Sequence, residues 1–146
     1  MKMVRRMKIE DVPYVAQIER QCFSTPWSEQ SLMKYADGKD SLFCVVEVNG
    51  VIAGYAGMYY VYPEADITNV AILNDYRGCG YAKALLEHML RVSGESGITE
   101  FTLEVRKSNT TAIKLYEKFG FVSEGIRKNF YDAPKEDAVI MWKRCN

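Results

Sequence analysis

The sequence predicts a mixed α/β fold in which helices cover both faces of one sheet. The first half carries a β-rich meander with short turns, of which Asn49-Gly50 is the clearest. In the second half, β-type runs alternate with two amphipathic helical segments in the order β-α-β-α-β-β. A meander followed by this alternation favours a sheet that contains both antiparallel and parallel neighbours.

The first half of the sequence predicts one strand, then two helices, and then three further strands. A loosely alternating run indicates a first strand, and Asp11, with Pro13 in the first turn, indicates the start of a helix. Ser28 caps a shorter helix in this prediction. Gly54 and Gly57 leave room for a bend or a close neighbour in the return strand of the hairpin. The predicted ranges are strands 2–7, 42–48, 51–62 and 65–73, and helices from 11 to 22 and from 28 to 35.

The second half predicts two longer helices between strands. Glycines 78 and 80 precede an apolar stripe of helical period that ends at Gly94 to Gly97. Asn109 caps the next helix and Gly120 ends it. An irregular loop around Pro134 separates the last two strands in this prediction. The strands are expected at 101–105, 121–126 and 138–143.

Composition and charge narrow the class of protein. The 146 residues contain no linker or repeat, so residues 1–146 are expected to form a single domain. The 19 Lys and Arg balance the 19 Asp and Glu, which argues against direct nucleic-acid binding as the main role. Because no apolar run reaches the roughly 20 residues that span a bilayer, and no signal segment is recognisable, we expect a cytoplasmic protein without a membrane partner.

The cysteines do not suggest a metal site. The four are widely scattered without a C-x-x-C pair, and the chain has one histidine, His88. A structural zinc site needs clustered ligands, so we expect no metal. Free and mostly buried thiols in a reducing cytosol are the preferred interpretation of Cys22, Cys44, Cys79 and Cys145.

The segment from Asn74 to Lys83 carries the clearest chemical signal. It follows a predicted strand and begins an amphipathic helix, so small residues there let backbone N–H groups surround an anion. Arg77 and Lys83 add cationic side chains on either side. The segment matches neither the P-loop nor the Rossmann pattern. On the glycines alone, a pyrophosphate site and a ligand-free glycine-rich turn are equally favoured.

Two further residues stand out by their position. Glu104 lies between Leu103 and Val105 in a strand, where a carboxylate is costly unless it is paired, lines a cleft or faces solvent. A solvated strand face and a cleft are equally favoured for it. Tyr116 lies on the apolar stripe of its helix, and a packed tyrosine with a bonded hydroxyl is the preferred interpretation before any resemblance is considered.

Taken together, these segments resemble the GCN5-related N-acetyltransferase superfamily, and within it the bacterial ribosomal-protein-alanine N-acetyltransferases. The superfamily signature R/Q-x-x-G-x-G/A is matched from Arg77 to Ala82. The resemblance spans nearly the whole chain. It includes Pro26-Trp27-Ser28, Asn69-Val70-Ala71-Ile72, Leu103-Glu104-Val105-Arg106, Ser108-Asn109, Leu115-Tyr116-Glu117 and the Arg127-x-Asn129-x-Tyr131 ending.

This resemblance implies a six- to seven-stranded, mostly antiparallel sheet with about four helices, splayed between strands 4 and 5 to admit acetyl-CoA as co-substrate. It implies that Glu104 is the general base and Tyr116 the general acid. Arg127 and Tyr131 would shape the substrate site from the loop before the last strand. The implied contacts to acetyl-CoA are Val70, Ala71, Ile72, Arg77, Gly78, Cys79, Gly80, Tyr81, Ala82, Lys83 and Asn109.

The implied substrate is the N-terminal α-amine, with alanine first, of a ribosomal protein. An α-amine with a pKa near 8 is neutral in roughly a tenth of molecules at pH 7, whereas a lysine amine near 10.4 is neutral in about one in a few thousand. An α-amine therefore needs less help with proton removal than a lysine amine, and a single glutamate acting directly or through a water is a suitable proton acceptor.

Two alternatives stay open. The same enzyme class could act on lysine side chains or a small amine, for which Glu47, Glu64 and Asp66 are candidate acidic residues. A regulatory module that binds acetyl-CoA without turnover is the other alternative, and the presence of Glu104 and Tyr116 argues against it.

Overall fold

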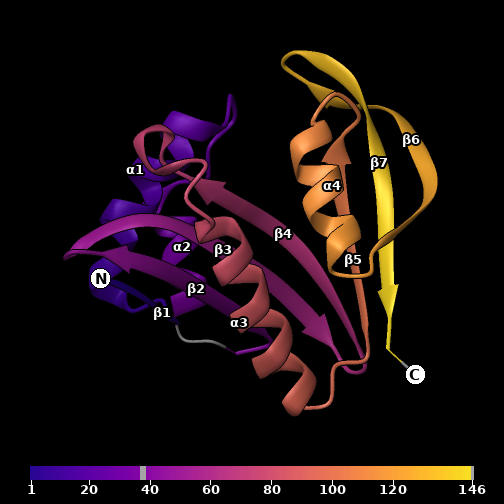
Figure 1. The fold of residues 1–146 in the computed structure, drawn as a ribbon. Coiled ribbons are helices and arrows are strands. Elements are labelled where there is room, and N and C mark those ends of the chain that lie inside the picture. Colours follow the sequence, from indigo (N-terminus) through magenta and orange to yellow (C-terminus); the bar gives the residue numbers. More distant parts are fainter. Residues whose placement is uncertain (37–38, 146) are drawn as a thin grey trace.

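One seven-stranded sheet, in the order β1-β2-β3-β4-β5-β7-β6, organises the computed structural model, which describes residues 1–36 and 39–145 (Figure 1). Its neighbours are antiparallel except for the parallel pair of β4 and β5. The strands are β1 Lys2–Arg6, β2 Ser41–Val48, β3 Val51–Val61, β4 Glu64–Ile72, β5 Glu100–Arg106, β6 Val122–Asp132 and β7 Lys135–Arg144. The α-helices are α1 Val12–Cys22, α2 Glu29–Ala36, α3 Tyr81–Glu95 and α4 Thr110–Lys118, with short 3-10 turns at Ile9–Asp11 and Asn74–Tyr76.

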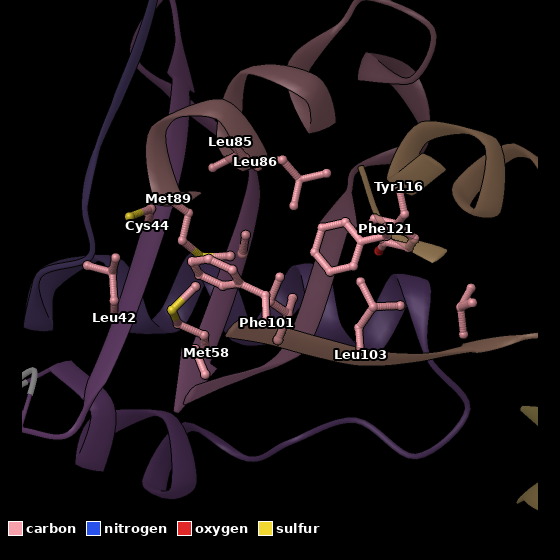
Figure 2. Packing of buried hydrophobic residues seen from close by; sticks show 14 of the residues in the cluster. Leu42, Cys44, Met58, Leu85, Leu86, Met89, Phe101, Leu103, Tyr116 and Phe121 are labelled. Atoms are coloured by element: carbon pink, nitrogen blue, oxygen red, sulfur yellow. The ribbon is translucent and has the colours of Figure 1, made fainter. Parts of the chain in front are cut away.

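Each face of the sheet has its own apolar core. α1 and α2 pack over a cluster that includes Phe43 and Tyr55, and the opposite face packs against α3 and α4. Figure 2 shows this second core, in which Phe101 and Leu103 of β5 and Tyr116 of α4 belong to one apolar cluster. Helices on both faces confirm the predicted fold class, and none of the described helices is long and apolar enough to cross a membrane.

A bulge in β4 changes which residues face each core. The β3–β4 register shifts between Gly57 and Met58, opposite Thr68. Before the shift Ile67 packs into the core under α3 and α4, whereas after it Ala71 packs with α1. Asn69 contacts α1 as well, through Glu19. The irregularity therefore turns Asn69 toward α1 just where β4 leaves β5.

β4 and β5 pair over only part of their length. The parallel register runs from Glu64 opposite Glu100 to Ile67 opposite Leu103, and beyond that point the strands diverge (Figure 1). The rest of each strand is held from its other side, β4 by β3 and β5 by β7. The structure thus confirms the expected splay between the fourth and fifth strands.

The predicted elements are present, and the glycine interpretation is confirmed at β3. A Cβ on Gly57 would lie 2.4 Å from the Phe43 ring, and one on Gly54 would lie 2.8 Å from the Ala71 carbonyl. Asn109 Oδ1 caps α4 by accepting the Ala112 N–H at 3.2 Å, as expected.

Three expectations need correction. The Asp11 side chain does not cap α1, because it instead accepts hydrogen bonds from Arg5 and from the Lys8 N–H. Arg127 and Tyr131 lie in β6 rather than in a loop, because the β6–β7 hairpin continues to Asp132, with an irregularity between those two residues. The four cysteines are free thiols, but they are not mostly buried: only Cys44 is buried, Cys22 is partly buried, and Cys79 and Cys145 are exposed.

Candidate active site

A cavity of about 550 Å³ lies where β4 and β5 diverge. Both strands line it, together with the C-terminal end of α1, the segment that leads to α2, Asn109 and Tyr116 around α4, and the β6–β7 hairpin. Because its walls come from both faces of the sheet, this cavity connects the two sides through the splay. Among the sequence-predicted site residues, it brings together Val70, Glu104, Asn109, Tyr116 and Tyr131.

Glu104 projects toward the α1 and α2 side of the sheet. Its neighbours Leu103 and Val105 are buried in the opposite core, so the alternation of a strand turns Glu104 the other way. The side chain is 25% exposed, and its Oε2 lies 3.2 Å from Arg127 Nη1. The geometry of that contact is not a hydrogen bond, so Oε2 is buried without a hydrogen-bond partner. A carboxylate with this spare oxygen is suited to accept a proton.

Tyr116 approaches the cavity from the other face. It is buried in the core beside Phe121, with ring centroids 5.8 Å apart. Burial raises the pKa of its hydroxyl to about 12, with a smaller contribution from Tyr131. A hydroxyl with this pKa stays protonated at neutral pH, so Tyr116 is suited to donate rather than to accept.

The glycine turn, residues 77–83, opens α3. Gly78 and Gly80 have positive φ angles of 77° and 84°, which glycine adopts without strain. The first helical hydrogen bond runs from Ala84 N–H to Gly80 O, and no side chain caps the helix. The N–H groups of Tyr81, Ala82 and Lys83 therefore lie outside the hydrogen-bond ladder of the helix, an arrangement that favours an anion.

The cationic and sulfur-containing side chains of this turn are not equivalent. Arg77 is directed back toward β4 and α1: its Nε donates to the Ile72 carbonyl at 3.0 Å, and its Nη2 lies 3.5 Å from Cys22 Sγ. Lys83 and Cys79 are exposed. Arg77 thus fixes the turn to the end of β4, and Lys83 is the more accessible cation.

Val70, Ala71 and Ile72 hydrogen-bond with β3 and lie beyond the paired part of β4. The β5-facing edge of their backbone is consequently outside the parallel ladder. Asn109 lies across the splay at the start of α4, where it lines the cavity. These residues flank the splay on its two sides.

The β6–β7 hairpin and the end of α1 close one side of the cavity. Tyr131 stacks beneath Arg106, whose Cζ lies 4.2 Å from the ring centroid. Arg106 also donates to the Ala133 and Pro134 carbonyls, and Ser24 Oγ donates to the Ala133 carbonyl at 2.6 Å. Burial, and then the negative charge of Glu104, raise the pKa of Tyr131.

Sequence reasoning missed a buried polar cluster formed by Glu19, Tyr55 and Asn69, of which Glu19 and Asn69 line the cavity. Glu19 is 1% exposed, and its carboxylate accepts hydrogen bonds from Tyr55 Oη, from Asn69 Nδ2 at 3.3 Å and from the Trp27 N–H at 2.8 Å. A signal was present, because Glu19 lies about one helical turn beyond Val15 and two turns beyond Val12 on the buried face of α1. A charge in that stripe needs buried partners.

The acidic residues considered for a small amine are dispersed. Glu47 pairs with Arg5 at 3.1 Å beside a different groove, and Glu64 is exposed at the start of β4. Asp66 is closest to the site: burial and the charge of Glu104 raise its pKa, and Arg127 opposes that shift. No group of three or more His, Cys, Asp or Glu residues able to hold a metal occurs within the described part of the chain.

Comparison with known proteins supports the resemblance to N-acetyltransferases that the sequence motifs indicate. The acetyltransferase (GNAT) family model matches residues 12–121. A protein of Escherichia coli (strain K12), named [ribosomal protein bS18]-alanine N-acetyltransferase, is 36% identical over 97% of this chain and 96% of its own. A protein of the same name from Haemophilus influenzae is 38% identical over 97% of both chains.

The fold agrees with these sequence relatives. The crystal structure of the ribosomal-protein-S18-alanine N-acetyltransferase from Escherichia coli superposes with a TM-score of 0.91 at 34% identity, covering 100% of this chain and 95% of that one. The match extends through the splayed strands and the β6–β7 hairpin, and it confirms the resemblance that the motifs indicated. The chain belongs to the acetyltransferase (GNAT) family.

Proposed function

We propose that this protein transfers an acetyl group from acetyl-CoA to the N-terminal α-amine of a ribosomal protein that begins with alanine. The observation that carries the proposal is the cavity at the splay, which Glu104 and Tyr116 enter from opposite faces of the sheet. The full-length likeness to relatives named for an alanine N-terminus supports this substrate. Synthesis of ribosomal proteins in the cytoplasm would place the enzyme there.

The residues present fit the coenzyme. The uncapped N–H groups at the start of α3 and the nearby Lys83 would hold its pyrophosphate, with Gly78 to Ala82 wrapping around it. The edge of Val70, Ala71 and Ile72 lies outside the parallel ladder. Its backbone groups other than the Ile72 carbonyl, which accepts from Arg77, would hydrogen-bond the pantetheine arm. Asn109 would contact the arm across the splay. Arg77 would act by fixing this turn to β4.

Acetyl-CoA would supply the acetyl group as a thioester, so transfer to an α-ammonium group forms a C–N bond and breaks the C–S bond. Nitrogen loses two protons, of which one leaves through Glu104 and the other ends on the CoA thiol. Glu104 takes the amine proton, directly or through a water, on the α1 and α2 side. Tyr116 donates its O–H toward the leaving sulfur from the α4 side. A backbone N–H of the splayed β4 stabilises the negative charge on the carbonyl oxygen.

The two halves of the chain have to work as one unit for this reaction. β4 with α1 provides one wall of the cavity, and β5 with α4 and the β6–β7 hairpin provides the other. We therefore propose that residues 1–146 act as one domain. Arg127 and Tyr131 would border the entering peptide, since Arg127 contacts Glu104 and Tyr131 lines the cavity.

The test uses purified protein, acetyl-CoA and short peptides that differ only in their first residue. Two further peptides separate the alternatives: one with a blocked N-terminus and an internal lysine, and one with both amines free. We expect acetylation at the α-amine, fastest with alanine first. Acetylation of the internal lysine alone would contradict the α-amine assignment, and the absence of any transfer would contradict the enzyme.

A further inference from the structure

Buried hydrogen-bond acceptors without a partner concentrate at the cavity. In the part of the chain that the structure describes, three buried side-chain atoms lack a hydrogen-bond partner: Ser41 Oγ, Asn69 Oδ1 and Glu104 Oε2. Both Asn69 and Glu104 line the cavity between β4 and β5. Glu104 Oε2 still has Arg127 Nη1 at 3.2 Å as an ion-pair neighbour, whereas no described residue satisfies Asn69 Oδ1 by an ion pair or a hydrogen bond. Because a buried polar atom without a partner is unfavourable, Asn69 Oδ1 indicates that a donor binds in this cavity.

The hydrogen bonds of Asn69 determine which of its atoms is available. Glu19 Oε2 lies 3.3 Å from the Asn69 side-chain nitrogen, and a carboxylate only accepts hydrogen bonds, so the NH₂ group must face Glu19. This leaves Oδ1 as the unused acceptor. Asn69 is 8% exposed, and the bulge in β4 turns it toward α1 at the start of the splay.

The carboxylate behind Asn69 is itself held firmly. Trp27 N–H, Tyr55 O–H and the Asn69 amide all donate to Glu19, and no described cation lies within ion-pairing distance of it. The cavity wall therefore carries a buried negative charge that three neutral donors satisfy. Such a wall favours a donor of positive or partly positive charge over an anion.

We propose that Asn69 Oδ1 accepts an N–H hydrogen bond from the reacting primary amine, and that Glu19 is a positioning residue that fixes the orientation of the Asn69 amide. The inference rests on the proposed function, because it assumes that an amine enters this cavity. An ammonium group carries three N–H bonds. Glu104 takes one proton and leaves a neutral amine with two N–H bonds. One of these stays hydrogen-bonded to Asn69 and helps aim the nitrogen lone pair, and the other gives the proton that nitrogen loses as the amide forms, which ends on the CoA thiol.

An amide oxygen suits this task better than a second carboxylate. It accepts a hydrogen bond without taking the proton, so the proton goes to Glu104. Groups that only accept hydrogen bonds, such as the thioester carbonyl or a peptide carbonyl, cannot satisfy Asn69 Oδ1. Asn69 therefore favours an amine that still has an N–H bond to donate after Glu104 has taken a proton. A primary amine meets this condition, and a fully substituted amine does not.

The experiment compares two variants and two peptides by calorimetry without an acetyl donor, so that no turnover occurs. Asn69→Leu removes Oδ1 and keeps the volume similar. Tyr55→Phe is the matched control, because it takes one donor from the same Glu19 oxygen and leaves Oδ1 in place. The peptides are identical except that one begins with alanine and the other with propionate, which lacks the amine.

We expect the wild type to bind the alanine peptide more tightly than the propionyl peptide by about tenfold or more, as for a hydrogen bond that involves a charged group. Asn69→Leu should lose that preference, whereas Tyr55→Phe should keep it. The affinity for CoA should stay within about twofold of wild type in both variants, within the scatter of substitutions that touch no ligand. Should Asn69→Leu fail to fold, Asn69→Ala carries the same expectation.

Distinct results overturn the inference and the proposed function. An unchanged amine preference in Asn69→Leu would refute the contact while leaving acetyl transfer intact. Equal loss in Tyr55→Phe, which keeps Asn69 Oδ1, would overturn the assignment of the amine preference to that oxygen. If Asn69→Leu abolishes the preference but the wild type acetylates no α-amine, the proposed function fails and the amine contact stands.

Discussion

The two walls of the cavity hold their carboxylates in opposite ways. On the α1 and β4 wall, Glu19 is 1% exposed and accepts hydrogen bonds from three neutral donors. On the β5 and β6 wall, the Glu104 side chain is 25% exposed and faces one arginine, Arg127, which is itself 57% exposed. One carboxylate is saturated with donors, whereas the other keeps an oxygen without a hydrogen-bond partner.

This difference indicates a structural role for Glu19 and a chemical role for Glu104. Both oxygens of Glu19 accept hydrogen bonds from buried neighbours, so Glu19 is suited to hold those neighbours in place. A group with one mobile partner can exchange that partner for a substrate proton, so Glu104 is suited to act as a base. The comparison predicts that the same Glu→Gln substitution lowers turnover on one wall and stability on the other.

The largest expected effect is that of Glu104→Gln on turnover. Removal of a general base typically lowers kcat by about 10² to 10⁴-fold. Because Arg127 is largely exposed, thermal unfolding should change little. Steady-state kinetics with an alanine peptide measure kcat, and Glu64→Gln, an exposed residue outside the cavity, is the control. Wild-type turnover in Glu104→Gln would show that Glu104 is not the general base.

Tyr116→Phe should have the next largest effect. A thiol has a pKa near 8.5 and leaves more readily than an alkoxide, so we expect kcat to fall by about tenfold to a hundredfold, toward the lower end for a general acid. With its pKa at about 12, the hydroxyl stays protonated in the wild type up to pH 10. A pH–rate profile whose alkaline limb falls near pH 8 and disappears in Tyr116→Phe would contradict this assignment. Tyr14→Phe, at an exposed tyrosine of α1, is the control.

Glu19→Gln should affect stability more than chemistry. The amide places an NH₂ group against donors that need an acceptor, so we expect the free energy of unfolding to fall by about 1–3 kcal/mol. Denaturant unfolding measures this loss, and Glu104→Gln provides the comparison on the opposite wall. If Glu104→Gln destabilises the protein as much as Glu19→Gln does, the two walls do not differ as proposed.

The smallest expected effect concerns Asp66, which reports the charge on Glu104. Burial and the charge of Glu104 raise the pKa of Asp66 in the folded protein, so its ionised form disfavours folding once the pH rises above the unfolded value of about 3.9. Asp66→Asn should therefore stabilise the protein slightly at pH 7 and leave stability unchanged at pH 3.

The same pair of charges can be followed by NMR. In a side-chain titration, Glu104→Gln should lower the pKa of Asp66 and Arg127→Ala should raise it, because Arg127 opposes the effect of Glu104. A pKa of Asp66 that responds to neither substitution would mean that Asp66 is not coupled to Glu104 and Arg127.

The sequence alone determined the order and type of the strands and helices, the glycine turn before α3, and the motif residues Glu104, Tyr116 and Asn109. These follow from local patterns: a period of two or of 3.6, capping residues, and glycines at positive φ. Their assigned roles depended on the resemblance, since position along the chain left Glu104 balanced between a cleft and solvent, and Tyr116 closer to a packed core.

Only the tertiary structure decided how the Glu19, Tyr55 and Asn69 cluster forms, that Arg127 faces Glu104, and that the β6–β7 hairpin continues through the predicted loop. These features join residues that lie far apart in the chain, across a β4 bulge and a splay that no local pattern encodes. A buried carboxylate becomes acceptable only when distant donors reach it, and that balance exists only in the folded protein.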